Sequence, residues 1–305
     1  MLRFAALASA VLVSGAAFAA DLPSRKGAPV PPPSAACLEK NALPIDVFGF
    51  QVGTDTNDYQ ALSASVQYNG FYGTRFGDFN GHQIIGQVSY GILPCMEIGP
   101  YLTGGWVKNG GLGGIGNGSY FGGGLEAKYK FLGRDTHGLG ATFDIIVQGV
   151  GNDGAFYAPT KSTWDVIPSL FLDKELISGK LYGAINVAYD FNFRNKVIAG
   201  IGDATDTGVL RLGAALSYQL VEGFFIGADI NHFRRYKGFF GDEFGYATTL
   251  GPNFYWQATP KLAVTAAYNV QVAGKTTGGP ALSGGDLDIV NFNQHLLKVK
   301  FAYSF

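Results

Sequence analysis

The chain has 305 residues, of which 47% are hydrophobic and 15% charged, and its formal net charge is −1. This balance excludes the strongly basic class of nucleic-acid-binding proteins and the acidic, disordered class, so we expect no nucleic-acid partner. Glycine is abundant, with 45 residues, but it follows no three-residue period, which excludes a collagen-like protein.

The N-terminal stretch predicts export. Arg3 precedes a short apolar run, and Ala17-Phe18-Ala19 satisfies the small-x-small rule for cleavage. We therefore predict a signal peptide over residues 1–19. No later stretch approaches the roughly 18 consecutive apolar residues of a transmembrane helix. Residues 20–42 are rich in proline, which disfavours helices and central strands, so we interpret them as an extended periplasmic segment.

Residues 43–305 repeat one pattern. Stretches of about ten residues alternate apolar with polar or small side chains, and turns separate them, as in a β protein. In LYGAINVAYDFNF, for example, Ile185 and Val187 share one face, and Asn186 and Asp190 share the other. We predict twelve strands, near residues 59–73, 79–91, 96–108, 118–130, 139–150, 162–173, 181–193, 208–220, 222–234, 245–258, 261–273 and 293–305.

The stretch IDVFGFQVGTD, residues 45–55, is left over from this count. It is either an added strand or a segment packed inside or beneath the other strands. An added strand would require a further, unrecognised partner and fourteen strands in all, because bacterial single-chain barrels have even numbers of strands. We favour twelve.

The connections favour a closed, antiparallel transmembrane β-barrel over a soluble β-sandwich. Short connections such as LVEG and ATPK alternate with long, glycine-rich ones such as KNGGLGGIGNG, as the short periplasmic turns and long outer loops of outer-membrane barrels do. Aromatic residues near strand ends, such as Phe254 and Trp256, suit the girdles at the membrane interfaces. We predict an all-β barrel in the outer membrane of a Gram-negative cell.

The C-terminal strand NQHLLKVKFAYSF places bulky apolar residues on one face and Lys298 and Lys300 on the other. Lysines are tolerated in the lumen, whereas on the lipid face they would cost about 2–4 kcal/mol. Phe301, Tyr303 and the terminal Phe305 resemble the signal that the barrel-assembly machinery of Gram-negative outer membranes recognises. We therefore expect that machinery as a partner during biogenesis, and outer-membrane lipid and lipopolysaccharide afterwards.

The two cysteines fall on one predicted side of the membrane. Cys37 lies in the proline-rich segment, and Cys95 lies in the turn ILPC, which we place at the periplasmic mouth. Two cysteines in an oxidising compartment predict a disulfide. Two unpaired thiols are the alternative.

Several stretches are similar to a known group of proteins. DVFGFQVGTD, LYGAINVAYD, GPNFYWQATPKLAVTAAYNVQVAG and the closing FNQHLLKVKFAYSF resemble uncharacterised outer-membrane β-barrel proteins of α-proteobacterial type, and so does the leader AAFAADLPSRK. The resemblance covers most of the mature chain. It implies a porin- or transporter-like barrel in the outer membrane. It implies no substrate, and it assigns no functional residues in this sequence.

Signals for catalysis, metals and cofactors are weak. The four histidines, His82, His137, His232 and His295, have no serine or cysteine two residues away, unlike some outer-membrane hydrolases. The acidic loops do not follow calcium-loop spacing, and the glycine runs lack the setting of a nucleotide loop. We predict no catalytic residues, no metal site and no cofactor, and hence a protein that is not an enzyme.

The inward-facing positions carry charges of both signs, and we predict that they line the lumen. Opposite charges could plug the barrel or form a narrow polar pore with a field across it. We favour a passive channel for small hydrophilic solutes; the alternatives are a non-conducting structural or surface-interaction barrel and, third, a lipid hydrolase. The predicted lumen residues are Glu97, Glu126, Lys128, Lys130, Asp144, Asp165, Asp190, Arg211, Asp229, Lys298 and Lys300.

Overall fold

The structure is a computed structural model. It describes residues 37, 43, 46–73, 79–109, 118–152, 160–196, 206–277 and 286–305. The predicted signal peptide over residues 1–19 lies outside the described residues. So does the proline-rich segment over residues 20–42, apart from Cys37.

Twelve β-strands make up almost all of the regular structure. They are β1 (Leu62–Tyr72), β2 (Phe79–Leu93), β3 (Met96–Asn109), β4 (Gly118–Leu132), β5 (Gly140–Asn152), β6 (Thr160–Ile177), β7 (Leu181–Lys196), β8 (Thr207–Val221), β9 (Phe224–Lys237), β10 (Glu243–Gln257), β11 (Leu262–Thr276) and β12 (His295–Ser304). The predicted strands coincide with these, and only their ends differ. For example, β6 continues past Asp173 to Ile177, because charged residues are compatible with a strand where it leaves the membrane for water.

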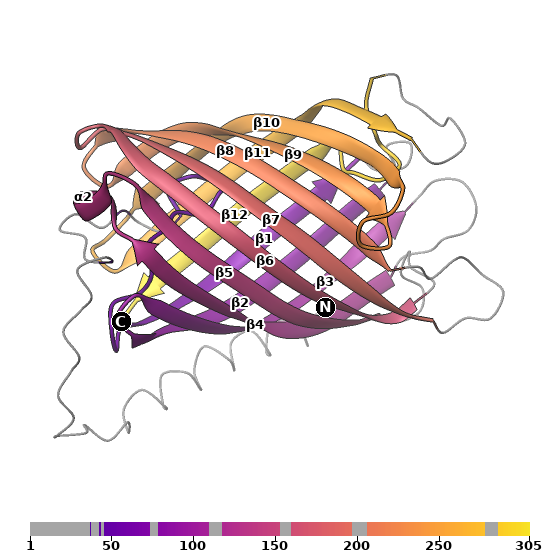
Figure 1. Cartoon of the computed structure of the whole chain (residues 1–305), viewed down its shortest axis with the longest axis horizontal. Helices are drawn as coiled ribbons and strands as arrows, with labels where there is room; N and C mark the ends of the chain where they lie inside the picture. Colours follow the sequence, from indigo (N-terminus) through magenta and orange to yellow (C-terminus); the bar gives the residue numbers. More distant parts are fainter. Residues whose placement is uncertain are drawn as a thin grey trace. The chain divides into compact units, whose positions relative to one another are not determined.

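The strands close into an antiparallel barrel in which each strand pairs with its neighbours in sequence, and β1 pairs with β12 (Figure 1). The closing register places Tyr68 opposite Val299 and Gln67 opposite Lys300. Closure satisfies every strand edge, as a bilayer requires, because lipid offers no hydrogen bonds to an open edge. The predicted fold is therefore confirmed, with twelve strands and not fourteen.

The two ends of the barrel differ in the length of their connections. At one end, here called the short-turn end, the strands are joined by residues 94–95, 133–139, 178–180, 222–223 and 258–261. At the other, the long-loop end, they are joined by residues 73–78, 110–117, 153–159, 197–206, 238–242 and 277–294. The short-turn end carries the short helix α2 (Arg134–His137), which ends at Gly138 in the left-handed conformation. Among the described residues, no helix is long and apolar enough to cross a membrane.

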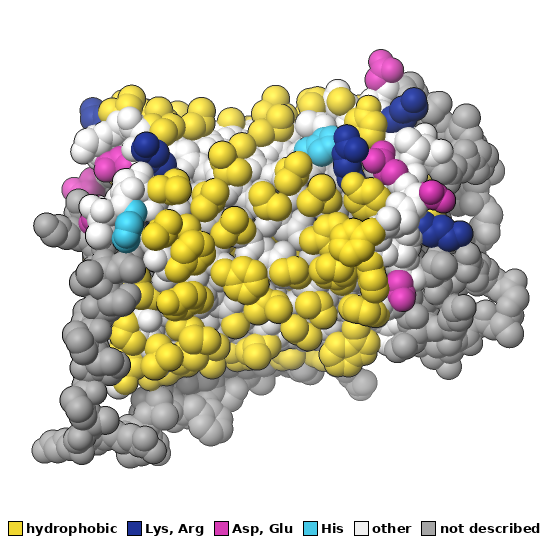
Figure 2. Space-filling model, viewed as in Figure 1, with side chains coloured by type: hydrophobic (Ala, Val, Ile, Leu, Met, Phe, Trp, Pro, Cys, Tyr) yellow, Lys and Arg dark blue, Asp and Glu magenta, His cyan; other side chains and the backbone are white. Residues whose placement is uncertain are grey.

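The strand alternation sorts side chains into an apolar outer face and a polar inner face. On β4, the odd-numbered Leu125 and Tyr129 are exposed, whereas the even-numbered Lys128 and Lys130 are buried. Figure 2 shows the result on one side of the barrel as a broad apolar band, with charged side chains gathered toward its two ends. This is the side-chain distribution of a wall that meets hydrocarbon outside and polar groups inside.

The described part of the leftover stretch, residues 46–55, is not a strand. Residues 46–50 form turns, and Gly49 adopts a φ of 69°, in the left-handed region that interrupts extended backbone. Of the two alternatives drawn from the sequence, the segment packed inside the barrel is therefore the correct one. Residues 46–58 are called the lumenal segment below.

Candidate functional site

The lumenal segment lies within the barrel at the short-turn end. Inward-facing side chains of β3, β4, β5, β6, β8, β9, β11 and β12 hydrogen-bond to it from around the wall. Val47, Phe48 and Thr54 have no accessible surface. A segment contacted from so many strands lies across the lumen at that level.

Asp46 is held by two lysines of the last strand. Its carboxylate lies 2.8 Å from Nζ of Lys300 and 3.9 Å from Nζ of Lys298. Lys298 also donates a hydrogen bond of 2.7 Å to the carbonyl oxygen of Gly49. Burial alone would raise the pKa of Asp46, but the two ammonium groups outweigh it and lower the pKa from 3.8 to about 2. Asp46 is therefore ionised at neutral pH.

Asp55 is held by two cations of β4 and α2. One carboxylate oxygen lies 2.5 Å from Nζ of Lys130 and the other 2.5 Å from Nη2 of Arg134. Arg134 donates in turn to both oxygens of Asp173, at 2.8 and 2.9 Å, and Asp173 accepts hydrogen bonds from the amide and hydroxyl of Thr54. Burial would lower the pKa of Arg134, but Asp55 and Asp173 outweigh it and raise the pKa.

An apolar cluster lies beside these ion pairs. Leu43, Val47 and Phe48 pack against inward-facing residues of four strands, and the buried cluster comprises Leu43, Val47, Phe48, Tyr182, Ala184, Ala215, Phe225 and Tyr255. Burial of a side chain the size of phenylalanine is worth about 1.5–3 kcal/mol. The segment is thus held by apolar packing as well as by charge.

The backbone of the segment is satisfied by wall side chains. Ser217 donates to the carbonyl of Val47, and Thr142 donates to the carbonyl of Thr54. The amide of Asn57 donates to Glu97 at 2.7 Å. Because buried backbone groups must find partners, these bonds replace the sheet pairing that the segment lacks.

Small wall residues give the segment its space. A Cβ added to Gly91 on β2 would lie 2.0 Å from the carbonyl oxygen of Asp58, and one added to Gly213 on β8 would lie 1.9 Å from the side-chain oxygen of Gln51. Both approaches are far shorter than a van der Waals contact. Glycine at these positions therefore permits the segment to lie against the wall.

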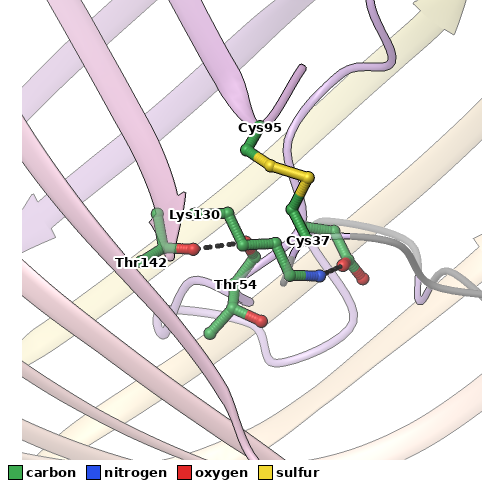
Figure 3. The surroundings of a disulfide bond; sticks show 6 residues. Cys37, Thr54, Cys95, Lys130 and Thr142 are labelled. Carbon is green, nitrogen blue, oxygen red and sulfur yellow. Dashed lines mark hydrogen bonds and ion pairs between the residues drawn. A yellow bond between two sulfur atoms is a disulfide. The ribbon is translucent and has the colours of Figure 1, made fainter. Parts of the chain in front are cut away.

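A disulfide joins Cys37 to Cys95 in the turn between β2 and β3, with a Cα–Cα distance of 5.6 Å. Figure 3 shows it close to Lys130, and to the bond between Thr142 and Thr54. The bond therefore ties the chain that precedes the lumenal segment to the short-turn rim of the wall. No free cysteine occurs among the described residues.

Toward the long-loop end, the inner wall is polar and hydrogen-bonded. One network runs from Gln67 through Asn69 and Gln83 to Thr103. A second joins Tyr101 to Gln148, and Gln148 to Asp165. Water and hydrophilic solutes can form hydrogen bonds with these amide, hydroxyl and carboxylate groups.

The eleven residues predicted to line the lumen fall into two groups. Glu97, Lys130, Asp229, Lys298 and Lys300 contact the lumenal segment. Of the others, Lys128 lies 3.2 Å from Glu126, and Arg211 lies 2.8 Å from Asp190. Asp165 accepts from Gln148 and Asn192. Asp144 is buried, and neither of its carboxylate oxygens has a hydrogen-bond partner in the described part of the chain.

Sequence reasoning missed the residues that complete the two ion clusters. Asp46 and Asp55 lie in the stretch for which the sequence left two placements open, and Arg134 lies in a connection between strands, where alternation gives no inward face. Asp173 could have been found, because it shares the parity of Asp165 on β6.

Three of the histidines lie on strands near the long-loop end, each bonded to a hydroxyl group. His82 is 2.7 Å from the hydroxyl of Tyr68, and His295 is 2.9 Å from that of Tyr268. His232 bonds to Thr248 at 2.9 Å. His137 lies in α2 at the other end.

Fold and site together define a closed, twelve-stranded β-barrel with an apolar exterior, a polar lumen and an internal segment that occupies one end. The chain belongs to DUF6662, a family of unknown function, whose model matches residues 45–305. The match covers the lumenal segment as well as the strands. No protein with a curated description matches the sequence.

Solved structures share the fold. The COG4313 outer membrane channel from Pseudomonas putida F1 aligns with a TM-score of 0.59 and 13% identity, over 83% of this chain and 98% of that one. The β domain of the Bordetella autotransporter BrkA aligns with a TM-score of 0.53 and 14% identity, over 81% of this chain and 100% of that one. At these identities the likeness concerns the fold alone.

Proposed function

We propose that this protein is a passive outer-membrane channel for small hydrophilic solutes, closed in the present structure by its own lumenal segment. The observation that carries the proposal is the contrast between the two halves of the lumen. The half toward the long loops is lined with amide, hydroxyl and carboxylate groups. The other half is filled by a segment that belongs to neither the sheet nor a turn between strands.

The manner in which the segment is held supports a removable closure. The hydrogen-bond ladder between β1 and β12 closes the barrel without any contribution from residues 46–58. Withdrawal of the segment would therefore break side-chain contacts but open no sheet edge. A displaced segment would also stay tethered at both ends, by the Cys37–Cys95 disulfide and by its continuation into β1.

The location and partners in this proposal follow from surface chemistry. The apolar outer band suits lipid, and the charged rims suit headgroups and lipopolysaccharide (Figure 2). In the Gram-negative setting, a signal peptide over residues 1–19 would be cleaved after export, and the barrel-assembly machinery would bind the C-terminal strand. Phe301, Tyr303 and Phe305 are exposed on that strand and at its end, where such a partner could reach them.

A second candidate, a non-conducting structural barrel, is favoured by one observation. The segment combines two charged clusters with an apolar cluster, so it is docked by more than one kind of interaction. If these contacts never release, then the barrel serves as a surface for its long loops and conducts nothing.

Single-channel recording in planar bilayers separates the two candidates. The variant Phe48→Asp places a carboxylate in a fully buried apolar site, which should expel the segment while leaving every strand residue unchanged. The channel proposal predicts rare openings for the wild type, frequent openings for Phe48→Asp, and wild-type behaviour for the conservative variant Phe48→Leu. A folded Phe48→Asp barrel that stays silent would support the structural candidate.

A further inference from the structure

The geometry points to a binding site for small organic carboxylates inside the lumen, which the carboxylates of Asp46 and Asp55 occupy while the channel is closed. This inference rests on the proposed channel function and names its solute class. The lumenal segment would then act as a ligand mimic that competes with the transported anion for the same wall cations.

The first half of the site comes from β12. Lys298 and Lys300 are two residues apart, so both face inward, and both form their ion pairs in the described part of the chain with Asp46. Lys298 additionally donates to a backbone carbonyl of the segment. When the segment leaves, two lysines lose their carboxylate at the same time. Two ammonium groups on one face of the strand then face the open pore together, so a solute carboxylate in that position would be favoured.

The second half comes from β4 and α2. Lys130 and Arg134 form ion pairs with different oxygens of Asp55, so each carboxylate oxygen has its own cation. Arg134 is itself fixed by its two hydrogen bonds to Asp173, which belongs to the wall and stays when the segment leaves. The guanidinium therefore keeps its orientation, and a pre-positioned guanidinium binds carboxylates well.

The wall acids nearby do not compete for these cations to the same extent. Glu97 and Glu126 flank Lys128, at 3.8 and 3.2 Å. Asp229 accepts hydrogen bonds from the amide groups of Asn231 and Asn269, at 2.9 and 2.6 Å. Glu126 interacts electrostatically with Lys300, and Asp229 with Lys298, but among the described residues the ion pairs of both lysines are with Asp46. Departure of Asp46 and Asp55 removes negative charge from beside the lysines and Arg134, which favours the entry of an anion at those positions.

Succinate tests the inference, with the uncharged succinamide as the matched control ligand. In the wild-type full-length protein, succinate should displace the segment and raise the open probability, whereas succinamide, or chloride at the same ionic strength, should not. The full-length variant Asp46→Asn/Asp55→Asn keeps all four cations but lacks the two carboxylates that mimic the solute. In this variant, succinate should bind in the open pore and reduce the current through it. Adding Lys300→Gln to that variant should weaken the succinate effect at least about tenfold.

The outcomes distinguish the inference from the function on which it rests. Conductance that responds equally to succinate and succinamide, or that Lys300→Gln leaves unchanged, would overturn the carboxylate site while keeping the channel. Silence of both the wild type and the Asp46→Asn/Asp55→Asn variant, with correct folding shown by circular dichroism, would overturn the channel itself. If Lys300→Gln does not fold, the wild-type comparison of succinate with succinamide still decides.

Discussion

The carboxylate of Asp46 lies 2.8 Å from the ammonium nitrogen of Lys300, so an ion pair inside the barrel joins the lumenal segment to the final strand. The two residues come from nearly opposite ends of the described chain. Because Asp46 pairs with a residue of β12, the lumenal segment has all of its partners only after β12 has joined the barrel. The N-terminal segment can therefore dock fully only in a finished barrel.

This ion pair predicts a pH dependence of closure. The pKa of Asp46 falls from 3.8 when free to about 2 when docked, so ionised Asp46 favours the docked state. The stabilisation is fully present above about pH 4 and is lost as the pH falls toward 2; the lowering corresponds to about 2 kcal/mol. Channel recordings on the wild type should therefore show more openings as the pH falls from 4 to 2. Asp46→Asn should open more at neutral pH and lose this component of the pH response.

Arg134 should contribute far more to stability than Arg211. Arg134 is buried between Asp55 and Asp173, and Arg134→Gln leaves both carboxylates short of a cation, which we expect to cost about 3–5 kcal/mol. Arg211, whose side chain is 46% exposed, has Asp190 as its one ion-pair partner among the described residues, so Arg211→Gln should cost about 0–1 kcal/mol. Thermal unfolding in detergent measures both. Equal losses of thermal stability in the two variants would contradict the burial of Arg134 between Asp55 and Asp173.

Gly91 offers a steric test with a control on the same strand. Gly91→Ala would bring a methyl group against the carbonyl oxygen of Asp58 and force the end of the lumenal segment to move. We expect about 1–3 kcal/mol of destabilisation and more frequent channel openings. Gly86→Ala, at a position where an added Cβ meets nothing within 4 Å, should leave both unchanged. Identical behaviour of the two variants would argue against the placement of Asp58.

The disulfide should stabilise the docked segment. The bond closes a loop with a sequence separation of 58, for which chain entropy predicts about 4 kcal/mol of stabilisation. The variant Cys37→Ser/Cys95→Ser, or the wild type with a reductant, should unfold at a lower temperature and open more often. Recovery of both cysteines as separately alkylated peptides from unreduced protein would show that the bond does not form.

The sequence predicted the barrel well because strands in a membrane wall follow a strict two-residue period. Leu125 and Tyr129 had to face outward once Lys128 and Lys130 faced inward, and the same logic ran through all twelve strands. The turns that separate these alternating stretches completed the count. These are local patterns, and a single sequence displays them directly.

The contents of the lumen were harder to predict because they depend on contacts between distant residues. The residues Asp46 and Asp55 carry no periodic signal, and their partners Lys300, Lys130 and Arg134 lie in other elements. Parity identified the wall lysines as inward-facing, but it could not name what they face. That information required the closed barrel, in which β1 and β12 are neighbours.

Hydrogen–deuterium exchange followed by mass spectrometry tests the central claim most directly, since it reports on residues 46–58 themselves. If they are docked inside the lumen as a separable segment, their peptides should be protected in the wild type and exchange rapidly in Phe48→Asp, while peptides from the strands stay protected in both. Rapid exchange of residues 46–58 in the folded wild type, at the rate of an unstructured peptide, would contradict the account.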